Sequence, residues 1–468
     1  MTVSFSPERT LAKLLFRILI LTMTVSNVGV VLVSLSLAQT DGEGYWPQWR
    51  GPHGTGVSLT AQPPIDWHES SDGDDRESKN IRWKIQLPGS GHSTPVIWND
   101  RLFVTTAVPV GPGLEPRYSR AVGAHDNIPV THKHRFEVLG LARNSGRVLW
   151  RQVVHEAVPH EGGHYTASQA SASPITDGQH VYAFFGSAGL FCLNLKGQLL
   201  WKVQLGTMQT KHGHGEGSTP VLHGDSLVIN WDHEGASFVV ALDKRTGEER
   251  WRVLRDEVTS WATPIVVEHQ GTRQVVVSGT QRVRAYDLHT GKEIWSCGGL
   301  SHNIVASPVA AKGLVFAASS YETRNLLAIM LDGAKGDVTE TDQVVWSTRR
   351  LTPYVPSLLV YDDTLYFLRH YQGIVSRLDI HSGQPMTGPL RLNGIRDVYA
   401  SPVAAANRIY ITDLDGTTAV LAHDRVPRLI AVNRLRESVS ASAALVDSEL
   451  YLRGSESLYC LAEEASDP

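Results

Sequence analysis

Cysteine is scarce in this sequence: only Cys192, Cys297 and Cys460 occur among 468 residues. No two of them are adjacent or in a CxxC spacing, so a disulfide framework is excluded. All three stand in strand-like segments or at the ends of such segments, where a cysteine normally serves as a small buried hydrophobic residue. A disulfide-stabilised fold is therefore not expected.

A strong excess of charge of either sign is also missing. The 43 Lys and Arg residues stand against 47 Asp and Glu residues, which gives a formal net charge of -4. Nucleic-acid binding normally requires a basic patch or a high pI, so a nucleic-acid partner is excluded. The composition, 42% hydrophobic and 19% charged, is that of an ordinary soluble globular protein.

Several enzyme and ligand motifs are absent as well. The sequence contains no GxSxG, no HExxH and no CxxCH. The glycine-rich segment WRGPHGTG, starting at Trp49, neither follows a strand nor begins a helix, so it is not a phosphate-binding loop. The acidic segment from Ser71 to Asn80 lacks the closing glutamate of an EF-hand, and we interpret it as a solvated linker.

The N-terminus has the pattern of an export signal. Basic residues at the start are followed by an apolar run from Ile18 to Leu37 and by the small residues SLA, which end at Ala38. We interpret residues 1–38 as a signal peptide. Because the apolar run is close to the ~20 residues that span a bilayer, an uncleaved inner-membrane anchor is the alternative. We therefore predict an exported protein of the periplasm or cell envelope, or a secreted one.

A short motif with a glycine four residues before a tryptophan recurs along the chain. The copies are NSGRVLW (Asn144 to Trp150), LKGQLLW (Leu195 to Trp201), RTGEERW (Arg245 to Trp251) and DLHTGKEIW (Asp287 to Trp295). A degenerate copy runs from Gly336 to Trp346, and another that begins at His381 has no tryptophan. Internal repeats of this kind indicate that one supersecondary unit is used several times.

A second element, a small residue followed by Ser or Thr and Pro, comes about a dozen residues after each tryptophan. It begins at Ser93, Ser171, Ser218, Ala262, Ala306 and Ala400, with weaker versions at Val355 and Ala441. Three of its prolines, at 220, 264 and 308, are spaced 44 residues apart. The two elements together define eight units.

Each unit contains four short segments with alternating apolar residues, and none of them has a helical period. Four antiparallel strands in a repeat of this length are typical of a propeller blade. The sequence therefore predicts an all-β fold, an eight-bladed β-propeller of four-stranded antiparallel blades.

The last unit has only three strands, and the segment 81–87 near the N-terminus has a strand without a unit of its own. We expect 81–87 to join the last blade and close the ring, which removes the exposed sheet edges. The propeller then occupies 81–465 and follows an extended leader or linker at 39–80. An insertion at about 109–136, which contains His125, His132 and His134, is expected to cover either the mouth of the ring or a blade edge.

The recurring D-x-x-T-G-x-x-x-W element resembles the pyrroloquinoline quinone (PQQ) type repeat, and the resemblance covers nearly all of the chain after the leader. It implies an eight-bladed propeller in which an outer-strand tryptophan packs between blades. The tryptophans at this position are Trp83, Trp150, Trp201, Trp251, Trp295 and Trp346. The leader motif WPQWRGPHGTGVS, from Trp46, is similar to that of exported bacterial members.

The resemblance implies one of two activities. Quinoprotein dehydrogenases of this family bind PQQ and Ca²⁺ over the propeller face, whereas non-catalytic members scaffold the assembly of outer-membrane proteins. The vicinal cysteine pair that lies beside PQQ in the dehydrogenases is absent here, and so is a haem motif. We therefore expect no cofactor, with PQQ and Ca²⁺ as the alternative.

The loop that leads from each outer strand into the next inner strand lies near the central mouth of a propeller. Polar and aromatic residues recur in these loops and are our candidates for ligand binding in a central funnel: His92, His164, His212, His214, Trp261, His302, Asn303, Tyr354, Arg396, Asp397 and Tyr399. Such a set suits a metal ion, an anion or a polar ligand. For a metal ion the candidates are His164, His212 and His214.

The sequence as a whole favours an exported, non-catalytic and monomeric propeller. We interpret it as a scaffold for a protein or polysaccharide partner. A quinoprotein oxidoreductase, or a metal-assisted enzyme that uses the histidine-rich funnel, is the alternative.

Overall fold

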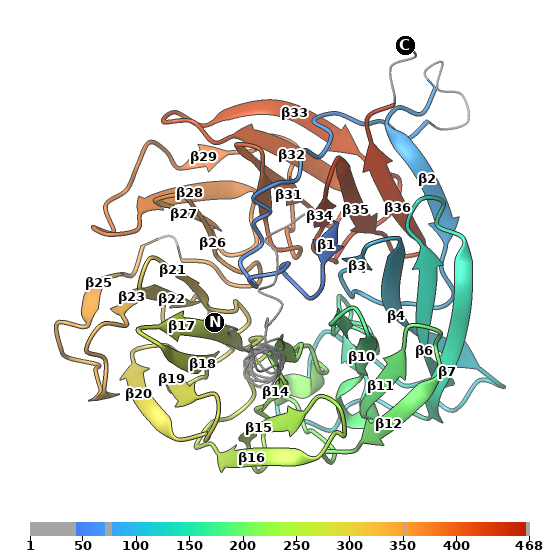
Figure 1. Ribbon diagram of the computed structural model, residues 1–468, viewed down its shortest axis with the longest axis horizontal. Coiled ribbons are helices and arrows are strands. Elements are labelled where there is room, and N and C mark those ends of the chain that lie inside the picture. Colours follow the sequence, from blue (N-terminus) through green and yellow to red (C-terminus); the bar gives the residue numbers. More distant parts are fainter. Residues whose placement is uncertain (1–43, 71–76, 351, 465–468) are drawn as a thin grey trace, which may run out of the picture. The chain divides into compact units, whose positions relative to one another are not determined.

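The computed structural model describes residues 44–70, 77–350 and 352–464. Within these ranges, eight small sheets are arranged around a central axis (Figure 1). The helical pieces in this part of the chain are two short 3-10 turns, η1 (Gly186–Ala188) and η2 (Lys211–Gly213). The predicted all-β, eight-bladed propeller is therefore confirmed.

The export signal or anchor predicted for residues 1–38 lies outside the described residues. In the described ranges, no helix has the length and apolar character needed to cross a membrane.

We number the blades in chain order and give their strands from the axis outwards. Blade 1 has β3 (Val96–Trp98), β4 (Arg101–Val110), β6 (Lys133–Ala142) and β7 (Val148–Ala157), with β1 (Tyr45–Trp46) added beside β3. Blade 2 has β9 (Ile175–Thr176), β10 (His180–Phe184), β11 (Leu190–Asn194) and β12 (Leu199–Val203). Blade 3 has β13 (Val221–His223), β14 (Ser226–Trp231), β15 (Phe238–Asp243) and β16 (Glu249–Leu254). Blade 4 has β17 (Ile265–His269), β18 (Thr272–Ser278), β19 (Arg282–Asp287) and β20 (Glu293–Gly298), followed by the short β24 (Gly336–Asp337).

The second half of the ring follows the same order. Blade 5 has β21 (Val309–Ala311), β22 (Leu314–Ser319), β23 (Asn325–Met330) and β25 (Val344–Thr348). Blade 6 has β26 (Leu359–Tyr361), β27 (Thr364–Leu368), β28 (Ile374–Asp379) and β29 (Leu390–Arg391). Blade 7 has β30 (Val403–Ala405), β31 (Arg408–Thr412), β32 (Thr417–Ala422) and β33 (Arg428–Arg434). Blade 8 has β34 (Ala444–Val446), β35 (Glu449–Arg453) and β36 (Ser457–Ala462), and its outer strand is β2 (Ile81–Gln86).

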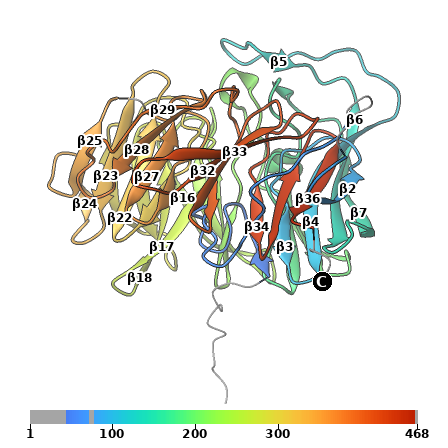
Figure 2. The same ribbon diagram turned by 90° about the horizontal axis from the view of Figure 1, so that it is seen from above.

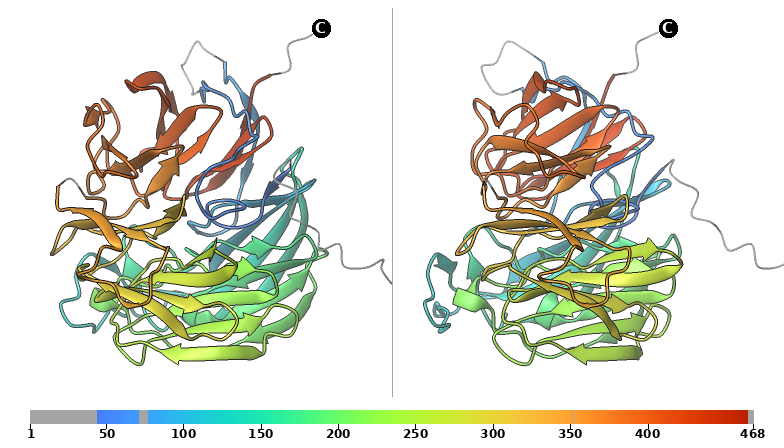
Figure 3. Two further views of the ribbon diagram at one scale, coloured as in Figure 1. Left: turned by 60° about the vertical axis from the view of Figure 1, so that its left-hand side comes forward. Right: turned by 90° about the vertical axis from the view of Figure 1, so that its left-hand side faces the viewer.

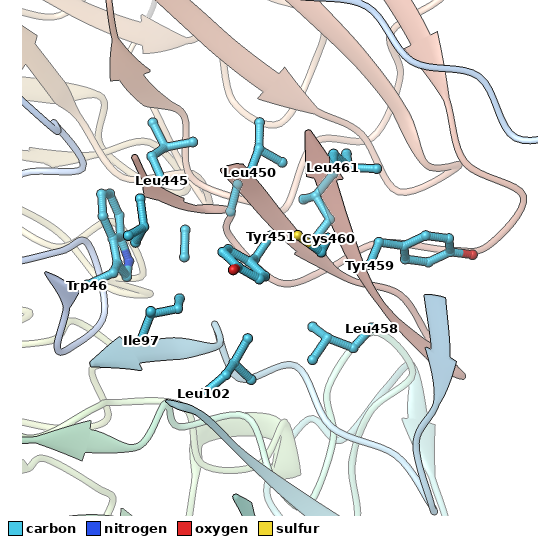
Figure 4. Close-up of a cluster of buried hydrophobic side chains, with 14 of the residues drawn as sticks. Trp46, Ile97, Leu102, Leu445, Leu450, Tyr451, Leu458, Tyr459, Cys460 and Leu461 are labelled. Carbon is cyan, nitrogen blue, oxygen red and sulfur yellow. The ribbon is translucent and has the colours of Figure 1, made fainter. Parts of the chain in front are cut away.

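Strand β2 closes the ring as predicted. It runs antiparallel to β36, with Lys84 opposite Tyr459 and Ile85 opposite Leu458, and Figures 1 and 3 show these N- and C-terminal parts side by side. The joint between blades 8 and 1 contains a large apolar cluster, in which Trp46 and Tyr451 are fully buried (Figure 4). The two ends of the propeller are therefore held by both hydrogen bonds and buried apolar area.

The repeated tryptophans lie on the outermost strands and pack against the turn glycine of the next blade. A Cβ added to the glycine would come within 2.5–2.8 Å of the indole ring in each of these pairs: Trp83 with Gly146, Trp150 with Gly197, Trp201 with Gly247, Trp251 with Gly291, and Trp346 with Gly383. In four of these pairs the indole Nε1 also donates to a carbonyl of the same turn, for example from Trp251 to Leu288 O at 2.9 Å. The glycine-to-tryptophan spacing thus encodes contacts between blades as well as a turn.

Trp295 is the exception. Its Nε1 donates to Gln274 Oε1 of its own blade at 2.8 Å. Gly336, which begins the degenerate copy, lies in β24 instead of a turn and pairs with the backbone of Trp295, and no atom lies within 4 Å of a Cβ built on it. The unit that follows Trp295 is the degenerate copy found in the sequence. Where the contact between tryptophan and glycine is missing, the motif is therefore degenerate too.

The Ser/Thr-Pro element forms a hydrogen-bonded ring around the axis. One hydroxyl residue from each blade takes part: Thr94, Ser173, Thr219, Thr263, Ser307, Ser357, Ser401 and Ser442. From Thr94 to Ser401, each backbone N–H donates to the side-chain oxygen of the next residue at 2.8–3.1 Å. Thr94 Oγ1 donates to Ser442 O at 2.9 Å and completes this hydroxyl ring.

Part of the predicted leader packs into the propeller rather than running through solvent. Pro47 O accepts a hydrogen bond from Thr176 N of blade 2 at 2.8 Å, and Ser58 N donates to Ala404 O of blade 7 at 2.9 Å. Trp67 N donates to Asn433 Oδ1 at 3.1 Å. We call residues 44–67 the plug. This segment crosses the inner strands of several blades and ends beside β33, the outer strand of blade 7.

Arg50 is the centre of the plug. Its Nη2 donates to Leu358 O and to Thr55 O, each at 2.6 Å, and its side chain is buried. Burial lowers the pKa of Arg50 to about 9. The buried guanidinium of Arg50 has no water to bond to in place of these carbonyl oxygens. Its hydrogen bond to Leu358 O therefore holds the plug to blade 6.

The predicted insertion at 109–136 lies at one end of the ring, where its loop projects beyond the blades (Figure 2). Strands β4 and β6 form an extended hairpin, and β5 (Asn127–Ile128) in its loop pairs with β8 (Gly163–His164). Asn127 Nδ2 also donates to His212 O at 2.7 Å. The insertion therefore covers the mouth, one of the two positions that the sequence left open.

The three cysteines are buried in blades 2, 4 and 8 and are free thiols. Burial raises the pKa of Cys192 and of Cys460 to about 12. These thiols are therefore core residues, as expected.

Candidate functional site

A funnel-shaped cavity of about 490 Å³ lies at the end of the ring that the insertion covers. Its floor is formed by the hydroxyl ring and by Trp49 of the plug. Eight of the predicted ligand-binding residues line it: His92, His164, His212, His214, Trp261, Asn303, Tyr354 and Tyr399. The structure therefore brings most of the predicted set together.

The other three predicted residues do not line the funnel. His302 is 49% exposed, with its Nε2 4.0 Å from Glu322. Arg396 and Asp397 use their backbones to hold the loop, with Arg396 N donating to Asp413 Oδ2 at 3.0 Å and Asp397 O accepting from Leu414 N at 3.1 Å. These loops border the funnel, but adjacent side chains in one loop point to different sides.

Sequence reasoning missed a second set of lining residues: Trp49, His125, Asp126, Tyr321, His370 and Tyr371. Tyr321, His370 and Tyr371 come from the hairpin between the second and third strands of a blade. In an antiparallel blade this hairpin is at the same end as the loop from the outer strand to the next inner strand. The tyrosine in the second hairpin of unit 5 and the His-Tyr pair in that of unit 6 were the signal that could have found them.

Four histidines form one side of the mouth, which we call the histidine wall. His125 comes from the insertion, His164 from β8, and His212 and His214 from the loop before β13. The ring centroid of His125 lies 4.7 Å from that of His212 and 4.9 Å from that of His214. His164 is 4.9 Å from His214, so the four rings make one packed group.

The nitrogens of the histidine wall bond to the protein itself. The distance from His125 Nδ1 to Gly123 O is 2.8 Å, and that from His164 Nδ1 to Thr166 Oγ1 is 2.7 Å. His214 Nε2 lies 3.3 Å from His125 O. In the described ranges, no group of three or more His, Cys, Asp or Glu side chains is placed to hold a metal ion. The structure thus gives no support to the predicted metal ion, because the rings pack on one another instead of directing nitrogens to one point.

Three of the funnel histidines are poor cations. Burial and the positive charge of Arg453 lower the pKa of His92 to about 4. Burial and the neighbouring imidazoles lower the pKa of His214 to about 4, and burial also lowers that of His164. These rings are neutral at pH 7, so they act as hydrogen-bonding and stacking groups.

The opposite side of the mouth is a tyrosine wall of Tyr321, Tyr354, His370, Tyr371 and Tyr399. The ring centroids of Tyr321 and Tyr354 are 5.7 Å apart, and those of Tyr371 and Tyr399 are stacked at 5.9 Å. His370 lies 4.6 Å from Tyr354. Burial raises the pKa of Tyr354 to about 12, so its hydroxyl keeps its proton. The wall therefore offers flat apolar faces and neutral donors side by side.

Asn303 adds an unused polar atom to the cavity. The residue is buried and adopts a positive φ of 63°. Its Oδ1 has no hydrogen-bond partner within the described part of the chain. A buried amide oxygen without a partner costs free energy, so this acceptor is available to a bound ligand.

PQQ and Ca²⁺, which the family resemblance implies, do not match these residues. PQQ is a polycarboxylate and requires cationic partners, but no lysine or arginine is among the described residues that line the funnel. The lining carboxylates are Asp126 and Glu216, and Glu216 accepts a hydrogen bond from Ser187 N at 2.6 Å. That no cofactor is bound stays a prediction, and we derive no redox step.

The resemblance to known proteins extends to whole structures. The chain is similar to BamB from Moraxella catarrhalis at 14% identity, with a TM-score of 0.54 over 82% of this chain and 100% of that one. It is also similar to quinohemoprotein alcohol dehydrogenase from Comamonas testosteroni at 10% identity, with a TM-score of 0.64 over 93% of this chain and 84% of that one. A europium-containing methanol dehydrogenase matches at 9% identity, with a TM-score of 0.56 over 90% and 98%. At these identities the likeness shows the fold alone.

At the level of sequence, no curated protein matches the chain. Residues 74–238 and 235–464 match a family model described as outer membrane protein assembly factor BamB. These segments cover most of the sequence and all eight blades. The chain therefore belongs to the BamB family of eight-bladed propellers.

Proposed function

We propose that this protein is an exported, non-catalytic binding propeller of the cell envelope, and that its funnel takes the end of a polysaccharide chain. The observation that supports this most is the pairing of a stacked tyrosine wall with a floor of serine and threonine hydroxyls in one cavity. A sugar ring has an apolar C–H face and a rim of hydroxyls, so it needs flat aromatic surfaces and neutral hydrogen-bonding groups together.

The size and charge of the funnel support the same ligand class. A volume of about 490 Å³ suits a short oligosaccharide. The neutral histidines, the tyrosine hydroxyls and the orphan Oδ1 of Asn303 supply both donors and acceptors. Neither wall presents a lysine or an arginine that would favour a phosphate or a polyanion.

Calorimetric titration with neutral tetrasaccharides that differ in linkage tests this function. Trp49 and Trp261 line the funnel, so a bound sugar should also change tryptophan fluorescence. We expect Tyr354→Ala to weaken binding about tenfold or more, because it removes the central ring of the tyrosine wall. Tyr118→Ala is the control, since Tyr118 is 65% exposed on the insertion outside the funnel. If no tetrasaccharide binds, or if the two variants weaken binding equally, this function is wrong.

A protein partner is the second candidate, and the family match favours it. The neighbouring outer strands β7 and β12 expose the apolar side chains of Val148, Leu149, Leu199 and Leu200. An exposed apolar strip on two adjacent strand edges suits an extended segment of another protein. Cross-linking from a photoreactive residue at position 149 in envelope extracts, with Leu200→Glu added as the control that disrupts the strip, tests this candidate. A cross-linked species that persists unchanged in the control would contradict it.

A further inference from the structure

A side chamber of about 200 Å³ adjoins the funnel beneath the insertion. His164, Glu216 and Trp261 line both cavities, so the chamber shares a wall with the mouth. Its other walls come from blades 2 and 3 and from the loop before β9. A ligand in the funnel therefore has a small neighbouring space into which one substituent can extend.

The chamber walls carry carboxylates and no opposing cation. Glu161 and Glu216 line it, and no lysine or arginine does so among the described residues. Glu161 accepts a hydrogen bond from Thr210 Oγ1, and Glu216 accepts from Ser187 N at 2.6 Å. The imidazole of His160 lines the same chamber, with Nε2 3.6 Å from Glu216 Oε1.

Asp232 differs from these two carboxylates because it is already neutralised. Both of its oxygens bond to Arg255, at 2.7 and 3.1 Å, and Ser260 Oγ donates to Oδ2 at 2.7 Å. The side chains of Asp232 and Arg255 are fully buried. The chamber carboxylates without a lysine or arginine partner are therefore Glu161 and Glu216.

An unpartnered acceptor gives independent support for a ligand. Asn230, on β14, is 1% exposed and lines the chamber. Its Nδ2 donates to Ser260 Oγ at 3.0 Å, which fixes the orientation of the amide. Its Oδ1 has no hydrogen-bond partner in the described ranges. A buried acceptor in this state calls for a donor from outside the protein.

Trp261 borders the chamber and the funnel with a fixed ring. Its Nε1 donates to Gly215 O at 2.7 Å, and its centroid lies 6.3 Å from that of His214. An indole face is the best aromatic partner for a cation. The chamber thus combines carboxylates, an orphan acceptor and an aromatic face, and none of its lining side chains is a lysine or an arginine.

We propose that the chamber is a subsite for a primary ammonium group, carried by an amino sugar at the end of the chain in the funnel. A primary ammonium has three donors and no acceptor, which is the complement of a wall made of acceptors. That the ligand is a sugar rests on the proposed function. That it carries an ammonium group rests on the chamber alone. Burial raises the pKa of Glu216, and a bound cation would lower it again.

The test compares two tetramers of glucosamine at about pH 6, where an amine is protonated. One tetramer is fully N-acetylated and uncharged, and the other is fully deacetylated. We expect the deacetylated tetramer to bind about tenfold or more tightly, because hydrogen bonds to charged groups are the strong ones. Glu161→Gln and Glu216→Gln should each reduce this preference to near equality. Glu293→Gln, on an outer strand and 43% exposed, should leave it unchanged.

The outcomes separate this inference from the proposed function. If Tyr354→Ala weakens both tetramers but the wild type prefers neither, the funnel binds sugar and the ammonium subsite is wrong. If neither tetramer binds, the proposed function fails. The ammonium subsite is then tested separately, by comparing how much glucosamine and glucose raise the melting temperature of the protein. A rise with glucosamine alone, lost in Glu161→Gln and Glu216→Gln, supports the subsite. An equal response to glucosamine, glucose and potassium chloride overturns it.

Discussion

The indole ring of Trp251 in blade 3 lies against the Cα of Gly291 in blade 4. A Cβ on Gly291 would sit 2.7 Å from Cδ2 of Trp251, and Trp251 Nε1 donates to Leu288 O of the same turn. Gly291 also has a positive φ of 72°. One residue therefore meets two requirements, a turn conformation that favours glycine and room for the tryptophan of the neighbouring blade.

Replacing this glycine should loosen the contact between blades 3 and 4. We expect Gly291→Ala to lower the free energy of unfolding by about 1–3 kcal/mol more than Gly336→Ala does. Gly336 is the matched control, because its φ of 66° carries the same backbone strain but its Cβ would meet no atom within 4 Å. Urea unfolding followed by tryptophan fluorescence measures both. Equal losses would show that backbone strain alone is responsible.

The hydroxyl ring predicts that replacing one of its hydroxyl groups by a methyl group lowers the stability of the fold. In the wild type, the buried N–H of Thr219 donates to Thr263 Oγ1 at 3.0 Å. Thr263→Val removes this acceptor and keeps the shape of the side chain. We expect a loss of about 1–3 kcal/mol in the free energy of unfolding. Thr263→Ser keeps the oxygen and should cost about 1 kcal/mol or less, from the missing methyl group. A valine variant as stable as the serine variant would contradict this role of the ring.

The histidine wall predicts that acid weakens the fold. The pKa of His214 is about 4 in the folded chain, below its ordinary value of 6.5, so the native state favours the neutral ring. The stabilisation is complete above about pH 6.5 and is lost as the pH falls through about 4. We expect His214→Gln to flatten the dependence of unfolding on pH between these values.

His302→Gln is the control for this experiment, since His302 is half exposed and lies outside the funnel. Urea midpoints at a series of pH values give the comparison. Slopes that are the same for wild type, His214→Gln and His302→Gln would show that the wall does not contribute to acid sensitivity.

Closure of the ring predicts that a short N-terminal deletion acts on the whole propeller. Removing residues 80–88 takes away β2, which pairs with β36 and carries Trp83 against Gly146 of blade 1. We expect a loss of several kcal/mol in stability and a tendency to self-associate, because β36 becomes an exposed edge. Thermal unfolding and size-exclusion chromatography measure the two effects. A monomer with an unchanged melting temperature would contradict the closure.

The repeat made the fold predictable from the sequence. Tryptophan and glycine at fixed spacing, together with the Ser/Thr-Pro element, report blade-to-blade contacts that recur around most of the ring, so they indicate eight blades and the closing strand. The reason that hydroxyl residues recur in this element could not be predicted, since Thr219 and Thr263 meet only when blades 3 and 4 pack together.

The site was predictable only where it follows the repeat. Tyr354 and Trp261 stand at equivalent places in their units, and the rule for the loops found them. Trp49 could not be found in this way, because the plug belongs to no unit and its position depends on long-range contacts such as that of Arg50 with Leu358. Glu161 and Asn230 are ordinary residues in sequence, and only their burial in one chamber distinguishes them.

The plug determines how a long molecule can use this protein. Because Trp49 and Arg50 fill the axis below the hydroxyl ring, the funnel is a pit with a single opening rather than a tunnel. A polymer cannot pass through such a funnel. It has to enter and leave through the one opening, with a terminus first. On the proposed function, a polysaccharide therefore binds by its end, and its internal stretches stay outside the funnel. The occupancy of such a site depends on the concentration of chain ends. It should therefore rise when long chains are cut into short ones at constant mass.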